Sequence, residues 1–207
     1  MGFGEWGTDY TDSEAVMRSL VSIVFASGFA FLLFGTGQAS GAGDWRDLPS
    51  AEHLPVFCNP KRDPQIAEKW NESRIPGLVW MNHYCQSMAR LPGCERASGE
   101  ARRGCLEHQL GGFKYVEDHA PKNYAFRPLV LVDWGKVLAK LGRYREAMFK
   151  YEEAIVLKPN YTRAYVALAW AYWNLDQKQF AVDAINRGLG QSPDSVTLKR
   201  MLKEFSG

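Results

Sequence analysis

The fold is decided by two consecutive stretches of equal length, residues 128–161, PLVLVDWGKVLAKLGRYREAMFKYEEAIVLKPNY, and residues 162–195, TRAYVALAWAYWNLDQKQFAVDAINRGLGQSPDS. Small residues, an apolar residue and a proline return after a step of 34 residues. The pairs are Ala147 and Ala181, Tyr151 and Ile185, Ala154 and Gly188, and Pro159 and Pro193. Large apolar residues fall between them at helical spacing, so each stretch predicts two helices packed as a hairpin.

This spacing resembles the tetratricopeptide repeat (TPR), whose pattern runs W-x2-L-G-x2-Y, then A-x3-F, A and P. The matching residues of the first stretch are Gly135, Leu138, Leu141, Gly142, Tyr144, Ala147, Tyr151, Ala154 and Pro159. Those of the second are Tyr165, Leu168, Ala169, Tyr172, Leu175, Ala181 and Pro193. The resemblance implies an all-α fold, an α-solenoid of TPR helix-turn-helix repeats, and a protein that binds other proteins.

A stack of such hairpins needs closed ends, because one hairpin cannot bury its apolar face alone. Residues 194–207 predict a capping helix, since their apolar residues recur at i, i+3, i+4 and i+7. These residues are Leu198, Met201, Leu202 and Phe205. Ser192 is a candidate N-cap for this helix, with Pro193 at its first position.

Residues 76–127 predict a degenerate first hairpin at the other end of the stack. We expect one helix over Trp80–Arg90, a break at Leu91-Pro92-Gly93, and a second helix over Ala101–His119. Gly112, Phe113 and Val116 would face inward. Upstream, residues 43–75 carry spaced prolines and predict an extended segment lying on this hairpin. Its expected contacts are Leu54, Val56, Phe57 and Cys58, and a short helix is possible over Pro64–Trp70.

Residues 1–42 predict a signal peptide or an N-terminal anchor. Leu20–Phe34 is an apolar run of 15 residues that follows Arg18. This length suits a signal peptide, which needs about 7–15 apolar residues, better than a bilayer span of about 20. Small residues before positions 40 and 43 offer cleavage sites, and Met17 is a candidate initiator. We therefore expect an exported, periplasmic or otherwise extracytoplasmic protein, held at the inner membrane if the segment is not cleaved.

Cysteine usage agrees with export, because an even number of cysteines in an oxidising compartment predicts disulfides. The four are Cys58, Cys85, Cys94 and Cys105. One possibility joins Cys85 to Cys105 across the predicted hairpin. The other joins Cys58 to Cys85 and Cys94 to Cys105, and we favour it because it tethers the N-terminal segment. Each bridge would contribute about 2–4 kcal/mol.

The run Met81-Asn-His-Tyr-Cys85 carries a second resemblance, together with Phe57-Cys58 and Tyr124-Ala-Phe-Arg-Pro128. These motifs are similar to those of a group of exported bacterial TPR proteins without an assigned role. The resemblance implies a bacterial periplasmic protein and a Cys58–Cys85 bridge, and it supplies no active residues.

The sequence predicts no catalytic, cofactor or metal site. It lacks the H-E-x-x-H, G-x-S-x-G, phosphate-loop and dinucleotide motifs. The cysteines and histidines show no ligand spacing, and His83 and Cys85 point apart on a helix. A net charge of +2 is also too small for a dedicated nucleic-acid binder. We therefore expect a non-enzymatic protein without cofactors, whose partner is a protein or a peptide.

The resemblance further implies a partner-binding groove lined by the first helix of each repeat. Its candidate residues are Leu129, Val132, Lys136, Lys140, Arg163, Val166, Trp170, Trp173 and Asn174. Some family members grip a partner's C-terminal carboxylate, but Val132 and Trp170 replace the Lys and Asn of that clamp. Trp170 and Trp173 are the candidate anchors, unless the first hairpin or the capping helix covers them. The basic and amide residues would then form a rim that selects an acidic or extended peptide.

Two functions fit these expectations. The first is an exported TPR adaptor that assembles or stabilises a periplasmic or envelope complex. The second is an accessory subunit permanently bound to a larger membrane enzyme or to a pilus or secretion machine. The mass of the mature N-terminus separates the two, because an uncleaved anchor favours the second.

Overall fold

A computed structural model describes residues 44–58 and 75–206, all within one compact unit. These ranges contain seven α-helices and no strand. The helices are α2 (Met81–Arg96), α3 (Gly99–His119), α4 (Arg127–Lys140), α5 (Tyr144–Leu157), α6 (Thr162–Asn174), α7 (Lys178–Gln191) and α8 (Val196–Ser206). The predicted signal peptide or anchor and the short helix over Pro64–Trp70 lie outside the described residues.

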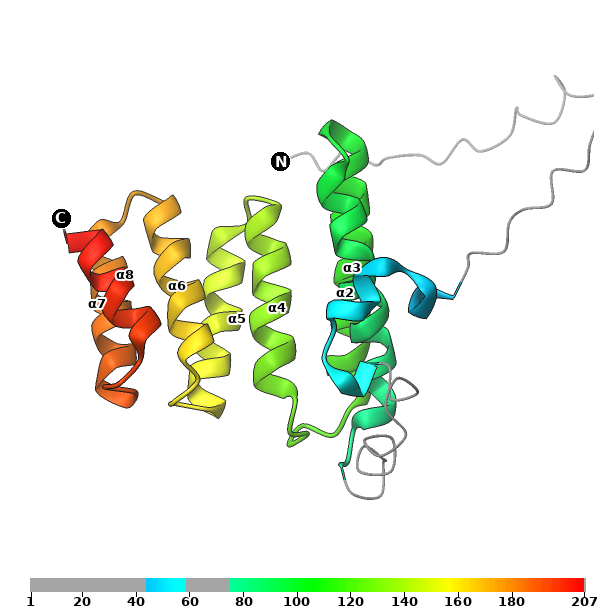
Figure 1. Cartoon of the computed structure of the whole chain (residues 1–207), viewed down its shortest axis with the longest axis horizontal. Coiled ribbons are helices and arrows are strands. Elements are labelled where there is room, and N and C mark those ends of the chain that lie inside the picture. The colour runs from blue at the N-terminus through cyan, green and yellow to red at the C-terminus, as the bar shows by residue number, and fades with distance from the viewer. Residues whose placement is uncertain (1–43, 59–74, 207) are drawn as a thin grey trace, which may run out of the picture. The chain divides into compact units, whose positions relative to one another are not determined.

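The helices form successive hairpins that stack side by side (Figure 1). Within each hairpin α2 packs on α3, α4 on α5 and α6 on α7, and each hairpin also contacts the next. α4 touches α6, and α6 touches α8, so the first helices of successive hairpins share one layer. The predicted all-α solenoid is therefore confirmed. None of the helices in the described ranges combines the length and apolar composition needed to span a bilayer.

Small residues set the close approach of the helices, as the repeat pattern predicts. Ala147, Ala154 and Ala181 are fully buried. Gly135 on α4 lies directly against the Tyr151 ring of α5, where a Cβ atom would overlap the ring carbons. A larger residue at position 135 would therefore push the two helices apart.

Helix α8 closes the stack with its apolar face inward. Leu198, Met201 and Phe205 are buried, and each contributes roughly 1.5–3 kcal/mol by leaving water. The expected N-cap at Ser192 is wrong. Ser192 instead ends α7, since its N–H donates to the Gly188 carbonyl at 2.9 Å, while Ser195 Oγ accepts the Leu198 N–H at 3.3 Å. The turn is longer than predicted because Pro193 lies within it rather than at the start of the helix.

The first hairpin differs from the prediction at Pro92. Helix α2 does not break at Leu91-Pro92-Gly93 but continues through Pro92 to Arg96. Proline removes one helical hydrogen bond and normally kinks or ends a helix. Here the turn beyond it is retained because Leu91 and Cys94 are buried and Cys94 is bonded to Cys105 of α3. Phe113 and Val116 face inward as expected.

The described part of the N-terminal segment lies on α2, but its backbone is not extended. It forms three short 3-10 helices, η1 (Trp45–Asp47), η2 (Pro49–His53) and η3 (Val56–Cys58), each in contact with α2. The Ser50 hydroxyl donates to the Ala89 carbonyl, and the Phe57 ring lies 4.6 Å from the Phe126 ring. Prolines at positions 49 and 55 permit short turns of this kind while excluding a long helix.

Candidate functional site

A groove of about 410 Å³ lies between α4 and α6 and reaches the start of α8. Five of the nine predicted groove residues line it, namely Lys136, Lys140, Arg163, Val166 and Trp170. Successive first helices bring these residues together because the hairpins stack in register. The remaining lining is small or apolar apart from Tyr151 and two threonines.

The two candidate tryptophan anchors differ in their exposure. Trp170 is 46% exposed and meets the Phe205 ring of α8 edge-on at 5.0 Å. Trp173 is half-buried, and its ring lies 4.0 Å from the same Phe205 ring. The capping helix therefore covers Trp173 but leaves Trp170 open to the groove.

The other predicted residues lie outside the groove. Val132 is fully buried in the core, so a partner cannot reach its side chain. Leu129 is half-buried against the first hairpin. Asn174 is exposed and donates to the Trp170 carbonyl at 2.7 Å, which ties it to the end of α6 instead of the groove.

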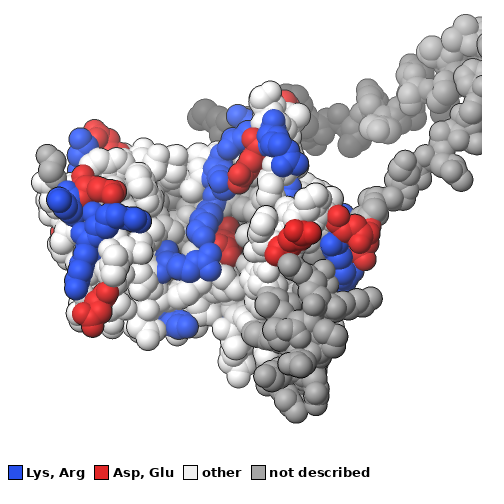
Figure 2. Space-filling model, viewed as in Figure 1, with Lys and Arg blue, Asp and Glu red and all other residues white. Residues whose placement is uncertain are grey.

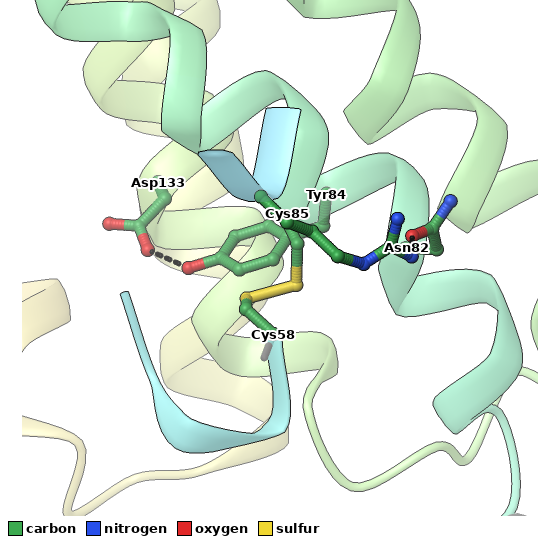
Figure 3. Close-up of a disulfide and its surroundings, with 6 residues drawn as sticks. Cys58, Asn82, Tyr84, Cys85 and Asp133 are labelled. Atoms are coloured by element: carbon green, nitrogen blue, oxygen red, sulfur yellow. Dashed lines mark hydrogen bonds between the residues drawn. A yellow bond between two sulfur atoms is a disulfide. The ribbon is translucent and has the colours of Figure 1, made fainter. Parts of the chain in front are cut away.

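A buried carboxylate that the sequence analysis missed supports the groove from beneath. Asp133 on α4 is 3% exposed and accepts a hydrogen bond from the Tyr84 hydroxyl of α2 at 2.8 Å (Figure 3). Its other oxygen accepts from Lys136 at 2.8 Å and from Arg163 at 3.4 Å. Asp133 therefore links three helices and positions two of the basic groove residues. In the sequence, the only sign of this buried carboxylate is an acidic residue between the apolar Val132 and Trp134.

The Tyr84 hydroxyl stays protonated and donates its hydrogen bond to Asp133. Burial raises the pKa of Tyr84, and the negative charge of the adjacent Asp133 raises this pKa further. Tyr84 lies next to Cys85, which bonds to Cys58 (Figure 3). The same turn of α2 thus holds both the N-terminal segment and the buried Asp133.

The basic residues of the groove are paired with carboxylates that lie just outside its lining. Among the described residues, none of those that line it is acidic, while Lys136, Lys140 and Arg163 are basic. Lys140 pairs with Glu95 of α2 at 2.8 Å, and both of these side chains are partly exposed. Figure 2 shows a band of Lys and Arg side chains that runs from the upper edge to the middle of the drawn face, with Asp and Glu side chains beside it. Three cations face two carboxylates, Asp133 and Glu95. The excess positive charge attracts acidic groups, most strongly at low ionic strength.

Comparison with known protein families decides the nature of the stacked hairpins. The family model described as TPR repeat matches residues 135–176, and the one described as tetratricopeptide repeat matches residues 162–195. Residues 135–195 are tetratricopeptide repeats. The TPR segment thus coincides with α4–α7, except for the first two turns of α4.

Solved TPR structures are similar to a larger part of the chain. The crystal structure of a thermophilic TPR protein of Thermus thermophilus has a TM-score of 0.53 and 22% identity, covering 61% of this chain and 63% of that one. The first TPR domain of Spaghetti (RPAP3), bound to an HSP90 peptide, has a TM-score of 0.42 and 17% identity, covering 58% and 92%. The chain matches no curated protein.

A second buried carboxylate joins the TPR segment to the first hairpin. Glu117 of α3 accepts hydrogen bonds from the Tyr124 hydroxyl at 2.7 Å and from Arg127 Nε at 3.0 Å. Arg127 also pairs with Glu153 of α5. Burial raises the pKa of Tyr124, and the hydrogen bond to Glu117 raises it further. This network fixes the connection between α3 and the TPR helices.

The run Asn82–Cys85 has a structural role, since Cys85 is bonded to Cys58. The structure joins Cys58 to Cys85 and Cys94 to Cys105, the pairing favoured from the sequence. The Cys85 sulfur is thus no free thiol nucleophile. The His83 ring lies tilted against the Tyr115 ring, with ring centres 3.8 Å apart. The described ranges hold no group of three or more side chains that could bind a metal ion.

Proposed function

We propose that the protein is a non-enzymatic TPR adaptor, exported from the cytoplasm, that holds a protein partner in the α4–α6 groove. The observation that carries this proposal is the exposed Trp170 in a groove lined by three cations. An aromatic anchor beside basic side chains suits a peptide that carries an apolar residue and neighbouring carboxylates. The adaptor would assemble or stabilise a periplasmic or envelope complex.

Cysteine pairing supports the export part of the proposal. All four cysteines are bonded in two disulfides, and such bonds persist chiefly in oxidising compartments. Thiol labelling of the protein taken directly from cells tests this. Unreactive cysteines are expected, while four reactive thiols would place the protein in a reducing compartment.

Partner capture with matched variants tests the groove. Trp170→Ala should abolish co-purification of a stoichiometric partner without unfolding the protein, because Trp170 is exposed. Trp173 is left intact, since it packs on Phe205 and its removal would destabilise α8. Phe180→Ala is the control, because Phe180 is 58% exposed on α7 and does not line the groove. Equal capture by both variants would exclude the groove as the binding site.

A further inference from the structure

A second, smaller cavity lies between α2 and α3, away from the TPR groove. Its volume is about 200 Å³, and its lining is mostly polar. The side chains that bear on its chemistry are His83, Gln86, Arg90, His108 and Tyr115. This volume is below the roughly 300–1,000 Å³ of pockets that hold drug-sized ligands. It therefore suits one small group and not a whole cofactor.

At the floor of the cavity, the polar side chains of Ser87 and Gln109 already make hydrogen bonds within the protein. Gly112 brings α3 so close to α2 that a Cβ atom there would lie 2.6 Å from the His83 carbonyl oxygen. The Ser87 hydroxyl donates to the Gln109 carbonyl at 3.0 Å, and the Gln109 amide donates to the Cys105 carbonyl at 3.2 Å. The Cys94–Cys105 bridge holds the two helices at this point.

The walls, in contrast, carry hydrogen-bond donors that have no partner in the part of the chain that the structure describes. Within residues 44–58 and 75–206, the half-buried Arg90 makes no ion pair and no side-chain hydrogen bond. In the same ranges the ring nitrogens of His83 and His108 and the Tyr115 hydroxyl are also unpaired. An arginine in such a position suits a carboxylate or phosphate ligand, because the guanidinium presents a rigid fork of donors.

The charge of the residues that line the cavity determines whether it favours an anion or a cation. Among the described residues that line this cavity none is acidic, while one is arginine and two are histidine. A cation would be repelled by Arg90, so the two histidines do not make a metal site. From this geometry we infer that the cavity binds a small anionic group, a carboxylate or a phosphate, through Arg90 and His108. This inference does not depend on the proposed function of the groove.

Calorimetric titration of the full chain with inorganic phosphate and with acetate tests the inference. At least one of the two should bind with one-to-one stoichiometry, and the preferred anion identifies the ligand class. Arg90→Gln should weaken that binding at least tenfold. Arg103→Gln is the matched control, since Arg103 is exposed on the same hairpin and does not line the cavity; its affinity should be unchanged.

His108→Ala provides a second test that does not risk the fold, because His108 is exposed. It should also weaken anion binding, with an unchanged unfolding temperature. Failure of both anions to bind would overturn the inference. So would an unchanged affinity of His108→Ala, or equal losses in Arg90→Gln and Arg103→Gln, which would indicate general attraction to a basic surface.

Discussion

Removal of one hydroxyl, in Tyr84→Phe, tests the buried network beneath the groove. The ring packs edge-on against Phe113 with centres 5.8 Å apart, and phenylalanine preserves this packing. What is lost is the 2.8 Å hydrogen bond from the hydroxyl to Asp133. Hydrogen bonds to charged groups contribute about 1.5–3 kcal/mol. Asp133 keeps Lys136 and Arg163 as partners, so no unpaired charge adds to this loss.

Urea unfolding followed by circular dichroism should therefore show a loss of about 1.5–3 kcal/mol in the free energy of unfolding. In a thermal melt the same loss lowers Tm by roughly 3–12 °C. Tyr151→Phe is the matched control, because Tyr151 is buried but its hydroxyl has no hydrogen-bond partner among the described residues. A loss of less than about 0.5 kcal/mol in Tyr84→Phe would refute a stabilising role for the Tyr84–Asp133 hydrogen bond. A loss in Tyr151→Phe equal to that in Tyr84→Phe would also refute it.

Further predictions concern the bridge, the cap and the buried phenols. Replacing Cys58 and Cys85 by serine should lower the free energy of unfolding by about 2–4 kcal/mol and expose residues 44–58 to limited proteolysis; protection equal to wild type would contradict the role of the bridge. Leu198→Ala should lose about 2–5 kcal/mol in urea unfolding because Leu198 is fully buried, whereas Val196→Ala, at a site 78% exposed, should be close to neutral. Burial raises the pKa of five tyrosines above the ordinary value of 10, and most strongly that of three. These three remain protonated in the folded state while the unfolded chain ionises. They are Tyr84, Tyr124 and Tyr151. The free energy of unfolding should thus fall as pH rises above about 10. Ultraviolet absorbance at alkaline pH should show these phenols ionising only when the protein unfolds. Ionisation before the loss of helicity would contradict their raised pKa values.

The sequence predicted the parts of the fold that local periodicity controls. Repetition of small residues such as Ala147 and Ala181 located the hairpins, because close helix packing requires them at fixed positions. The i, i+3, i+4, i+7 spacing of Leu198 to Phe205 likewise located the cap. Both features appear in the sequence as residues at fixed spacings.

Features that depend on distant contacts were missed or misjudged. Tyr84 and Asp133 are 49 residues apart, so nothing local indicates their hydrogen bond. Helix α2 continues through Pro92 because a disulfide to α3 and burial of its last turn outweigh the missing hydrogen bond. The family resemblance placed Val132 in the groove, but its side chain is fully buried in the core.

Site-specific photo-crosslinking in the cell of origin tests the central claim most directly. A photoreactive side chain at position 170 lies in the groove, and one at position 180 lies on α7 outside it. The account predicts a discrete adduct with a partner protein from position 170 and none from position 180. An adduct from position 180 alone, or none from position 170 in cells where the protein co-purifies with a partner, would contradict it.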